Sequence, residues 1–256
     1  MTLELGLRAV AAFFAGLVDA MAGGGGLVQL PALFAAFPEA HAATLFGTNK
    51  AASVWGTGWA TWQYASRVQL PWAALWPAAL AALIGSGAGA WCVTVADPII
   101  LRQALPFVLL AVLIYTLVRR HLGRVHAPRY QGRTQTAVAS AIALIVGAYD
   151  GFFGPGTGSF LVFLFVRLLG FDFLHASASA KLLNTVTNAS ALLLFAYKGH
   201  VWWHLAALMA VANVIGSLIG TRMALRHGAP FVRVVFVCVV ALLIVKSVWD
   251  GYFKVA

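Results

Sequence analysis

Two aspartates and two lysines stand at matching positions in an otherwise apolar sequence. Asp19 precedes the run Gly23–Gly26, and Lys50 follows that run about 25 residues later. Adding 131 to the aspartate and lysine numbers leads to Asp150 and Lys181, so the same charged residues occur twice. A charge inside an apolar protein costs free energy unless it is paired or hydrated. These four residues therefore indicate a site for charged chemistry.

The offset of 131 relates much of the chain, not only its charges. Between 16–89 and 147–220, 17 of 74 positions are identical without a gap. The frequency of alanine and leucine accounts for some of the identical positions, but not for those occupied by rarer residues. The identical positions with rarer residues are Gly16 and Gly147, Gly23 and Gly154, Gly25 and Gly156, Trp72 and Trp203, Gly85-Ser86 and Gly216-Ser217, and Gly89 and Gly220. We interpret the chain as two copies of one unit.

Composition assigns the chain to the membrane. It is 62% hydrophobic and only 9% charged, with a mean hydropathy of +0.89, too little charge for a soluble surface. The net charge of +10 is concentrated in two arginine-rich loops around 119–133 and 222–233, as in cytoplasmic loops that fix topology. No aromatic residues interleave with them, so no nucleic-acid partner is expected. Cys92 and Cys238 lie in apolar runs and are interpreted as core residues.

Each copy is expected to contain five apolar helical segments. They are 5–22, 27–37, 41–65, 72–95 and 99–120 in the first copy, and 134–151, 157–170, 174–197, 202–226 and 229–250 in the second. The second segment of each copy spans only ~17–21 Å as a helix, too short to cross a bilayer comfortably. Glycine-rich backbone precedes it in both copies, so we expect a broken or half-length helix whose N-terminus points into the protein.

The segment count predicts an all-α integral membrane fold of two inverted repeats. The predicted repeats are residues 1–120 and 134–256, joined by a basic cytoplasmic linker, 121–133. With five segments per repeat the N-terminus lies outside and nearly all arginine lies inside. If the short segments are only re-entrant hairpins, the count becomes four plus four and both termini lie inside. Short, glycine-interrupted segments at matching places indicate the binding site of a secondary transporter.

The lysines and glycines are expected to hold a small anion. An inverted two-fold axis brings Lys50 and Lys181 toward each other near the midplane, where converging ammonium groups need a negative partner. The partner is an anionic substrate, the two aspartates, or each in turn. Free N–H groups and positive helix ends after the glycine runs provide an anion seat. The alternative use of glycine is close helix packing, which suits Gly85, Gly89, Gly216 and Gly220.

Short polar residues complete the predicted site. The substrate-binding residues are Lys50, Lys181, Gly23, Gly24, Gly25, Gly26, Thr48, Asn49, Gly154, Gly156, Thr157, Gly158 and Asn184. Asp19 and Asp150 either carry a coupling proton or balance the lysine charge, and the sequence leaves both roles open. His175, His200 and His204 show no ligand-like spacing and are interpreted as interfacial or polar core residues. No metal site and no cofactor are expected.

The motifs around these residues resemble the TauE/SafE family of sulfite-exporter-like permeases. They are Ala15-Gly-Leu-Val-Asp19-Ala-Met-Ala-Gly-Gly-Gly-Gly-Leu-Val-Gln-Leu-Pro31, Gly47-Thr-Asn-Lys50, Gly147-Ala-Tyr-Asp150-Gly-Phe-Phe-Gly-Pro-Gly-Thr-Gly158 and Ala180-Lys181-Leu-Leu-Asn184. The resemblance implies a multi-pass bacterial inner-membrane transporter for a small oxidised-sulfur or organosulfur anion, such as sulfite or a sulfonate. It does not fix the substrate.

Transport by alternating access at a midplane site is therefore the expected function. The alternatives are an uncoupled anion channel and a transporter of another small anion, such as a carboxylate. An intramembrane enzyme is not expected, because no nucleophile–base pair is recognised in the sequence. The expected partners are a small anionic substrate and the lipid bilayer, with protons as candidate coupling ions and a homo-oligomer as a candidate assembly.

Overall fold

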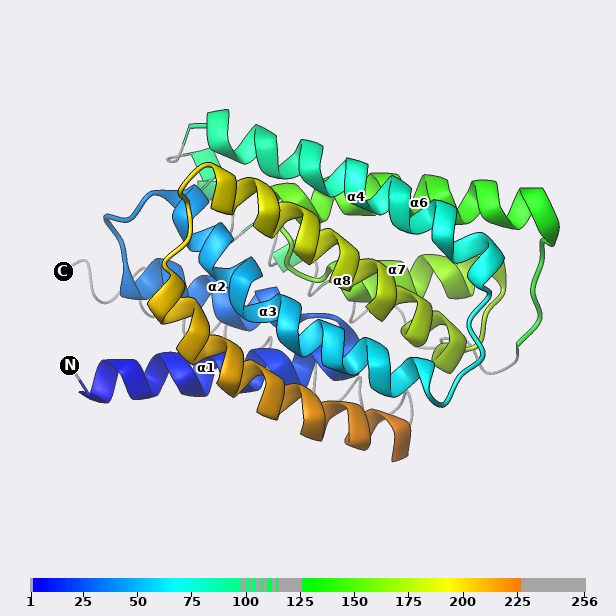
Figure 1. Cartoon of the computed structure of the whole chain (residues 1–256), viewed down its shortest axis with the longest axis horizontal. Helices are drawn as coiled ribbons and strands as arrows, with labels where there is room; N and C mark the ends of the chain where they lie inside the picture. Colours follow the sequence, from blue (N-terminus) through cyan, green and yellow to red (C-terminus); the bar gives the residue numbers. More distant parts are fainter. Residues whose placement is uncertain are drawn as a thin grey trace.

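The chain folds as a bundle of helices, shown in Figure 1. The computed structural model describes residues 2–97 and 126–226, with isolated positions between them, and these residues contain no strand. The predicted segment 229–250, most of segment 99–120, and Cys238 lie outside the described residues. Three described helices are long and apolar enough to cross a membrane: α4 (Trp72–Val95), α6 (Gly132–Phe152) and the helix Trp203–Arg226.

The helix surfaces suit lipid rather than water. Large apolar side chains stand exposed along the outer faces, including Trp76, Leu80 and Ile84 on α4 and Ile145 on α6. Exposed apolar area of this extent is unfavourable in water and favourable against hydrocarbon. Cys92 also lies exposed on α4, so its interpretation as a core residue was wrong. The small, weakly polar thiol is tolerated on such a surface. The helical membrane fold predicted from composition is confirmed.

The short helices appear where the glycines predict them. Helix α1 (Thr2–Ala22) ends at a break, and α2 (Gly25–Ala36) follows. Likewise α6 ends before α7 (Thr157–Leu164), which continues into a π-helical turn, η1 (Phe165–Leu169). Gly23 and Gly154 have φ of 76° and 90°, a backbone conformation that side chains with a Cβ rarely adopt. Local backbone chemistry thus ends α1 and α6 within the molecule.

Each short helix turns back toward the end from which the chain entered. Arg8, near the start of α1, lies 4.4 Å from the centre of the Phe37 ring, just after α2. In the second half, the Arg129 N–H before α6 donates to the carbonyl of Leu169, the last residue of η1, at 2.9 Å. Helices of 12 or 13 residues rise ~18–20 Å. Each break therefore lies deep inside the bundle.

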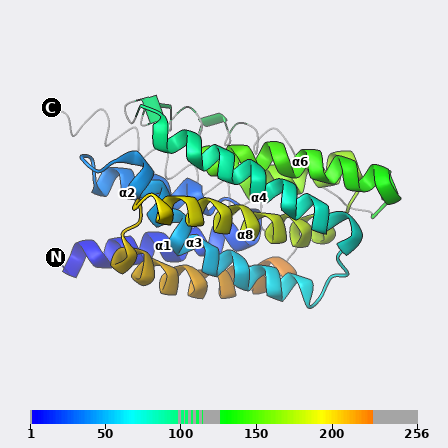
Figure 2. The same ribbon diagram turned by 45° about the horizontal axis from the view of Figure 1, so that its top comes forward.

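The long helices α3 (Ala42–Ala65) and α8 (Phe173–Tyr197) run side by side through the bundle, as Figures 1 and 2 show. Their N-caps are the side chains of His41 and Asp172, which accept hydrogen bonds from backbone N–H groups of the first turn. They are long enough to cross a membrane, but lysine and other polar residues lower their hydropathy. These two helices carry the predicted lysines.

The N-terminus and residues 126–131 lie at opposite ends of the bundle in Figure 1. The turn 66–71 and the end of the helix Trp203–Arg226 lie with residues 126–131, whereas the connections 37–41 and 198–202 lie with the N-terminus. The inverted arrangement of two five-segment repeats stays a prediction, because most of segment 99–120 and all of segment 229–250 lie outside the described residues. Of the arginines described, all but Arg8 belong to segments that reach the end holding 126–131, which we call the arginine end.

The two halves exchange equivalent packing contacts. Gly85 and Gly89 of α4 lie so close to the backbone of α6 that an added Cβ would overlap the carbonyls of Leu144 and Ala148. Their equivalents meet α1 in the same way. There Gly216 and Gly220 approach the carbonyls of Phe13 and Leu17, at the same offset of 131. Such reciprocity is what a two-fold relation between the halves requires, and it gives these glycines the packing role expected from sequence.

Candidate functional site

Lys50 of α3 pairs with Asp150 of α6. The Nζ to Oδ2 distance is 2.7 Å, and both side chains are only 2% exposed. The other carboxylate oxygen accepts a hydrogen bond from the hydroxyl of Thr157, the first residue of α7, at 2.7 Å. Two donors therefore hold this carboxylate, one charged and one neutral. The site of Lys50 is closed to water in this structure.

Lys181 of α8 makes the equivalent pair with Asp19 of α1. Here Nζ lies 3.1 Å from Oδ2 and also donates to the main-chain carbonyl of Asp19. The remaining carboxylate oxygen lies 3.3 Å from the N–H of Gly25 and 3.5 Å from the amide of Asn184. The Asp19 side chain is 11% exposed, and that of Lys181 is 3% exposed.

Both pairs join one half of the chain to the other. Each lysine takes the aspartate of the opposite copy, over sequence separations of 100 and 162 residues. The attraction between two opposite charges offsets part of the cost of burying them, and removing one partner leaves the other uncompensated. The sequence indicated that the aspartates lie near the lysines, but it did not specify which aspartate pairs with which lysine.

The two glycine-rich breaks meet between the pairs. The N–H of Gly158 donates to the carbonyl of Gly23 at 3.0 Å, and neither glycine has room for a Cβ at this contact. A Cβ on Gly154 would lie 3.1 Å from the Lys50 ammonium. Gly25 at the other break packs against the Asp19 side chain. The breaks and both ion pairs thus form one continuous polar centre.

The starts of the short helices are already partly occupied by anionic or carbonyl oxygens. At α2 the Gly25 N–H points to the Asp19 carboxylate. At α7 the Thr157 N–H donates to the carbonyl of Gly154, and the Gly158 N–H to Gly23. Asp19 therefore occupies a place that suits an anion, at the positive end of a helix and beside an ammonium.

Thr48 and Asn49, two residues predicted to bind substrate, lie on α3 but form no hydrogen bond with the ion pairs in the part of the chain that the structure describes. The Thr48 hydroxyl accepts a hydrogen bond from the Trp202 N–H at 3.1 Å, which directs it toward the connection after α8. Asn49 is 4% exposed, and its Oδ1 has no hydrogen-bond partner among the described residues. An unpaired buried polar atom costs about 1–3 kcal/mol. Asn49 is therefore a site at which a ligand group would be stabilising.

The residues predicted from the sequence to form the site do not include Gln29. It lies on α2, is fully buried, and accepts a hydrogen bond from Asn213 at 3.4 Å, while its Nε2 has no partner among the described residues. At the equivalent positions of the other half stand Phe160 and Ala82. A lone glutamine within an apolar half-helix is the signal that could have drawn attention to it.

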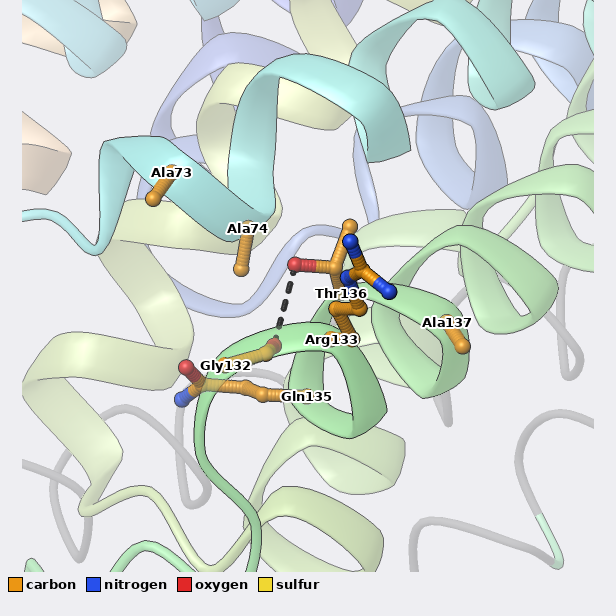
Figure 3. Close-up of a pocket in the computed structure, with 7 residues that line it drawn as sticks. All are labelled: Ala73, Ala74, Gly132, Arg133, Gln135, Thr136 and Ala137. Carbon is orange, nitrogen blue, oxygen red and sulfur yellow. Dashed lines mark hydrogen bonds between the residues drawn. The ribbon is translucent and has the colours of Figure 1, made fainter.

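A surface hollow of about 470 Å³ opens elsewhere, between the first turns of α4 and α6. Figure 3 shows its lining residues, among them Arg133 and Thr136, whose hydroxyl donates to the Gly132 carbonyl at 3.2 Å. Asp150 lies 13 residues beyond the last of them on α6, or ~20 Å along the helix. This hollow is separate from the lysine pairs, and the shared cavity between the lysines stays a prediction.

The histidines that the structure describes lie toward the two ends of the bundle. At one end His41 and His200 stack with ring centres 5.1 Å apart, and the His200 Nδ1 lies 3.2 Å from the Thr44 hydroxyl. Partial burial lowers the pKa of His200, and the nearby His41 and Lys198 lower it further. At the arginine end His175 lies 2.8 Å from Asp172. Partial burial raises the Asp172 pKa, but hydrogen bonds from His175 outweigh this, so the pKa is lowered overall.

Comparison with known proteins agrees with the motifs. Residues 8–247 match the family described as sulfite exporter TauE/SafE. The chain is 36% identical over 242 residues to the "Probable membrane transporter protein ORF9" of Sinorhizobium sp, covering 94% of this chain and 91% of that one.

Two further relatives carry similar descriptions. The chain is 35% identical over 254 residues to the "Probable membrane transporter protein YfcA" of Escherichia coli strain K12, covering 98% and 91% of the two chains. A "Probable membrane transporter protein" of Haemophilus influenzae is 32% identical over 243 residues, covering 94% and 93%. No solved structure matches the chain.

Proposed function

Because this chain belongs to the sulfite exporter TauE/SafE family of membrane transporters, we propose that it carries a small oxidised-sulfur or organosulfur anion, such as sulfite or a sulfonate, at the two lysine–aspartate pairs. The proposal rests on the observation that each lysine pairs with the aspartate of the other half of the chain. A transporter site at the interface of two repeats can open to either side when the halves move against each other.

Each aspartate carboxylate occupies the position that we propose for an oxyanion of the substrate. Each carboxylate is an oxyanion held by an ammonium together with a neutral donor, which is the Thr157 hydroxyl at Asp150 and the Gly25 N–H at Asp19. A sulfite or sulfonate oxygen accepts hydrogen bonds from the same donors. We propose that the substrate replaces one carboxylate at its lysine during transport.

Charge balance then favours proton coupling. Each pair is neutral as a unit, so an added anion leaves one uncompensated negative charge in a buried place. An unpaired buried charge costs several kcal/mol. A proton on the displaced aspartate removes that charge. The proposed stoichiometry is one proton for each negative charge that the substrate brings.

Burial of the lysines favours a gated transporter over an open channel. Both lysine side chains are at most 3% exposed, which supports a closed, gated site over an open aqueous path. We assign the repeats to residues 1–120 and 134–256 and the arginine end to the cytoplasm, in the inner membrane of a bacterium. The concentration of arginine at that end supports this orientation.

A small carboxylate is the second candidate substrate. The same donors already hold the carboxylates of Asp19 and Asp150, which favours it specifically. Since the chain's relatives are described as membrane transporters, we propose no enzymatic activity and no cofactor. A homo-oligomer and the absence of any nucleic-acid partner belong to the same proposal.

Uptake by proteoliposomes tests the function. Purified protein is reconstituted and offered sulfite, an alkyl sulfonate, a small carboxylate and a monovalent cation, each with and without an imposed pH gradient. We expect saturable uptake of a sulfur oxyanion that Lys50→Met abolishes. Lys198→Met, at the exposed C-cap of α8, is the matched control and should leave uptake unchanged. Uptake of the cation alone, or equal uptake by the Lys50 variant, contradicts the proposal.

A further inference from the structure

Three potential metal ligands meet at the arginine end, away from the lysine pairs. They are His126, in the segment before α6, and Asp172 and His175, at the start of α8. One ligand atom from each lies within 4.8 Å of the other two. The rings of the two histidines pack with centres 4.0 Å apart. His126 and His175, which stand 46 and 3 positions from Asp172 in the chain, thus converge on its carboxylate.

The spacing of these atoms suits a small metal ion. Asp172 Oδ2 lies 2.8 Å from His175 Nδ1 and 3.6 Å from His126 Nδ1. Ligand atoms that each stand ~2.0–2.1 Å from a tetrahedral metal are ~3.3 Å apart, between these two values. Small side-chain rotations would therefore bring all three atoms to bonding distance of one ion.

The surroundings hold the ligands in place while leaving access. The second carboxylate oxygen of Asp172 accepts a hydrogen bond from the backbone N–H of His175 at 2.8 Å. This bond caps α8 and keeps the carboxylate oriented. The Asp172 N–H lies 3.3 Å from His126 Nδ1, a long hydrogen bond that a metal would displace. The side chains are 24–35% exposed, which lets an ion enter and water provide a fourth ligand.

We propose that His126, Asp172 and His175 bind one divalent transition-metal ion, such as Zn²⁺. Two imidazoles and one carboxylate are ligands that such ions prefer, whereas Ca²⁺ and Mg²⁺ require more oxygen atoms. Arg129, close by in the chain, disfavours a site that relies on general negative charge. Direct bonds from nitrogen are therefore needed.

The site is independent of anion transport through the lysine pairs. Its ligands connect the segment before α6 to the start of α8, where Ala127 and Arg129 already donate backbone hydrogen bonds to Gly170 and Leu169 at 2.9 Å. A bound ion would add a strong link between the same two segments. It would therefore raise the thermal stability of the folded chain, increasingly so as the free metal concentration exceeds the Kd.

Equilibrium dialysis against Zn²⁺ tests the proposal on the full chain, purified with a tag that contains no histidine. We expect about one ion per chain at saturation. His126→Gln, His175→Gln and Asp172→Asn should each weaken binding at least about tenfold. Asparagine is also a good N-cap, so the Asp172 variant keeps the start of α8 folded. Bound Co²⁺ should give a visible absorption spectrum that the same variants lose.

The His41–His200 pair at the opposite end provides the matched control. Its rings stack, and His41 caps α3 at the position equivalent to Asp172. His200→Gln and His41→Gln should leave Zn²⁺ affinity within about twofold. The proposal is overturned if the wild type shows no saturable binding. It is equally overturned if Asp172→Asn binds as tightly as the wild type, or if the control variants lose as much affinity as the ligand variants.

Discussion

The two lysine–aspartate pairs occupy equivalent positions but are held differently. Lys50 and Asp150 are 2.7 Å apart and 2% exposed, and a hydroxyl at 2.7 Å completes the carboxylate's contacts. Lys181 and Asp19 are 3.1 Å apart, with longer neutral contacts and a carboxylate that is 11% exposed. Equal residues at equal places thus make one tight and one looser pair.

The difference originates at the first turn of each short helix. Thr157 begins α7 and offers a hydroxyl to Asp150, whereas Gly26 stands at the equivalent position of α2 and has none. Asp19 relies on the Gly25 backbone N–H instead. A hydroxyl can rotate to follow the carboxylate, but a backbone N–H is fixed by its helix. We expect the Lys181–Asp19 pair to open more readily to a substrate.

The largest effect should come from removing each lysine. Lys50→Met keeps the apolar stem but leaves Asp150 buried without its cation, and should cost about 3–5 kcal/mol of folding stability. Lys181→Met should cost less, because Asp19 is more exposed and keeps its Gly25 and Asn184 contacts. Unfolding in detergent measures both, and each variant should also weaken anion binding by about 2–5 kcal/mol.

A double variant separates the folding role of Lys50 from its transport role. Adding Asp150→Asn to Lys50→Met removes the orphaned charge, so most of the lost stability should return while transport stays absent. Equal costs for the two lysine variants would contradict the difference between the pairs. Undiminished anion affinity in either would contradict the site itself.

Next come the aspartates. If the carboxylates carry the coupling proton, Asp150→Asn and Asp19→Asn should bind or exchange substrate yet lose the pH dependence of net uptake. We expect the greater loss of exchange rate in Asp150→Asn, because its lysine has no second oxygen from the same aspartate. Net and exchange uptake are measured across a pH series. An unchanged pH profile with tighter binding would show that the residue only balances the lysine charge.

Substitutions of glycine at the two helix breaks should have intermediate effects on stability and transport. Gly23→Ala forces a Cβ at φ 76° against the backbone of Gly158, and should cost about 2–4 kcal/mol. Gly154→Ala, at φ 90°, meets the movable end of Lys50 first and should cost less stability but more transport. Gly199→Ala has the same φ of 76° with open space around it, so it reports the cost of strain alone, about 1 kcal/mol. A Gly23 variant no worse than this control would mean that the breaks do not pack closely.

The smallest effects should come from the neutral donors. Thr157→Val removes the hydroxyl 2.7 Å from Asp150 and should cost about 1–3 kcal/mol of stability. Asn184→Leu removes an amide 3.5 Å from Asp19, a distance at which hydrogen bonds contribute little, and should cost under about 1 kcal/mol. Thermal unfolding of the two variants side by side gives the ranking. The reverse order would show that the Asp19 pair is the more tightly held.

Much of the site could be predicted from particular residues. Glycine-rich stretches disfavour a regular helix interior, so Gly23 and Gly154 located the breaks, and the half-length helices α2 and α7 followed from them. The observed bounds of α3, Ala42–Ala65, lie within a residue of the segment expected from apolar length. By contrast, Cys92 faces outward and His175 joins a three-residue cluster, and neither was expected. Their surroundings come from segments distant in the sequence.

By itself the sequence determined that this is a helical membrane protein with two matching charged positions. Hydropathy, glycine conformation and the cost of an isolated charge act locally and can be read residue by residue. Only the tertiary structure decided that Lys50 takes Asp150 and Lys181 takes Asp19, that the breaks meet at Gly23 and Gly158, and that His126 reaches Asp172. Those partners depend on how long helices pack across the two halves. Sequence offset reveals equivalence between positions, but contact requires the close approach that packing creates.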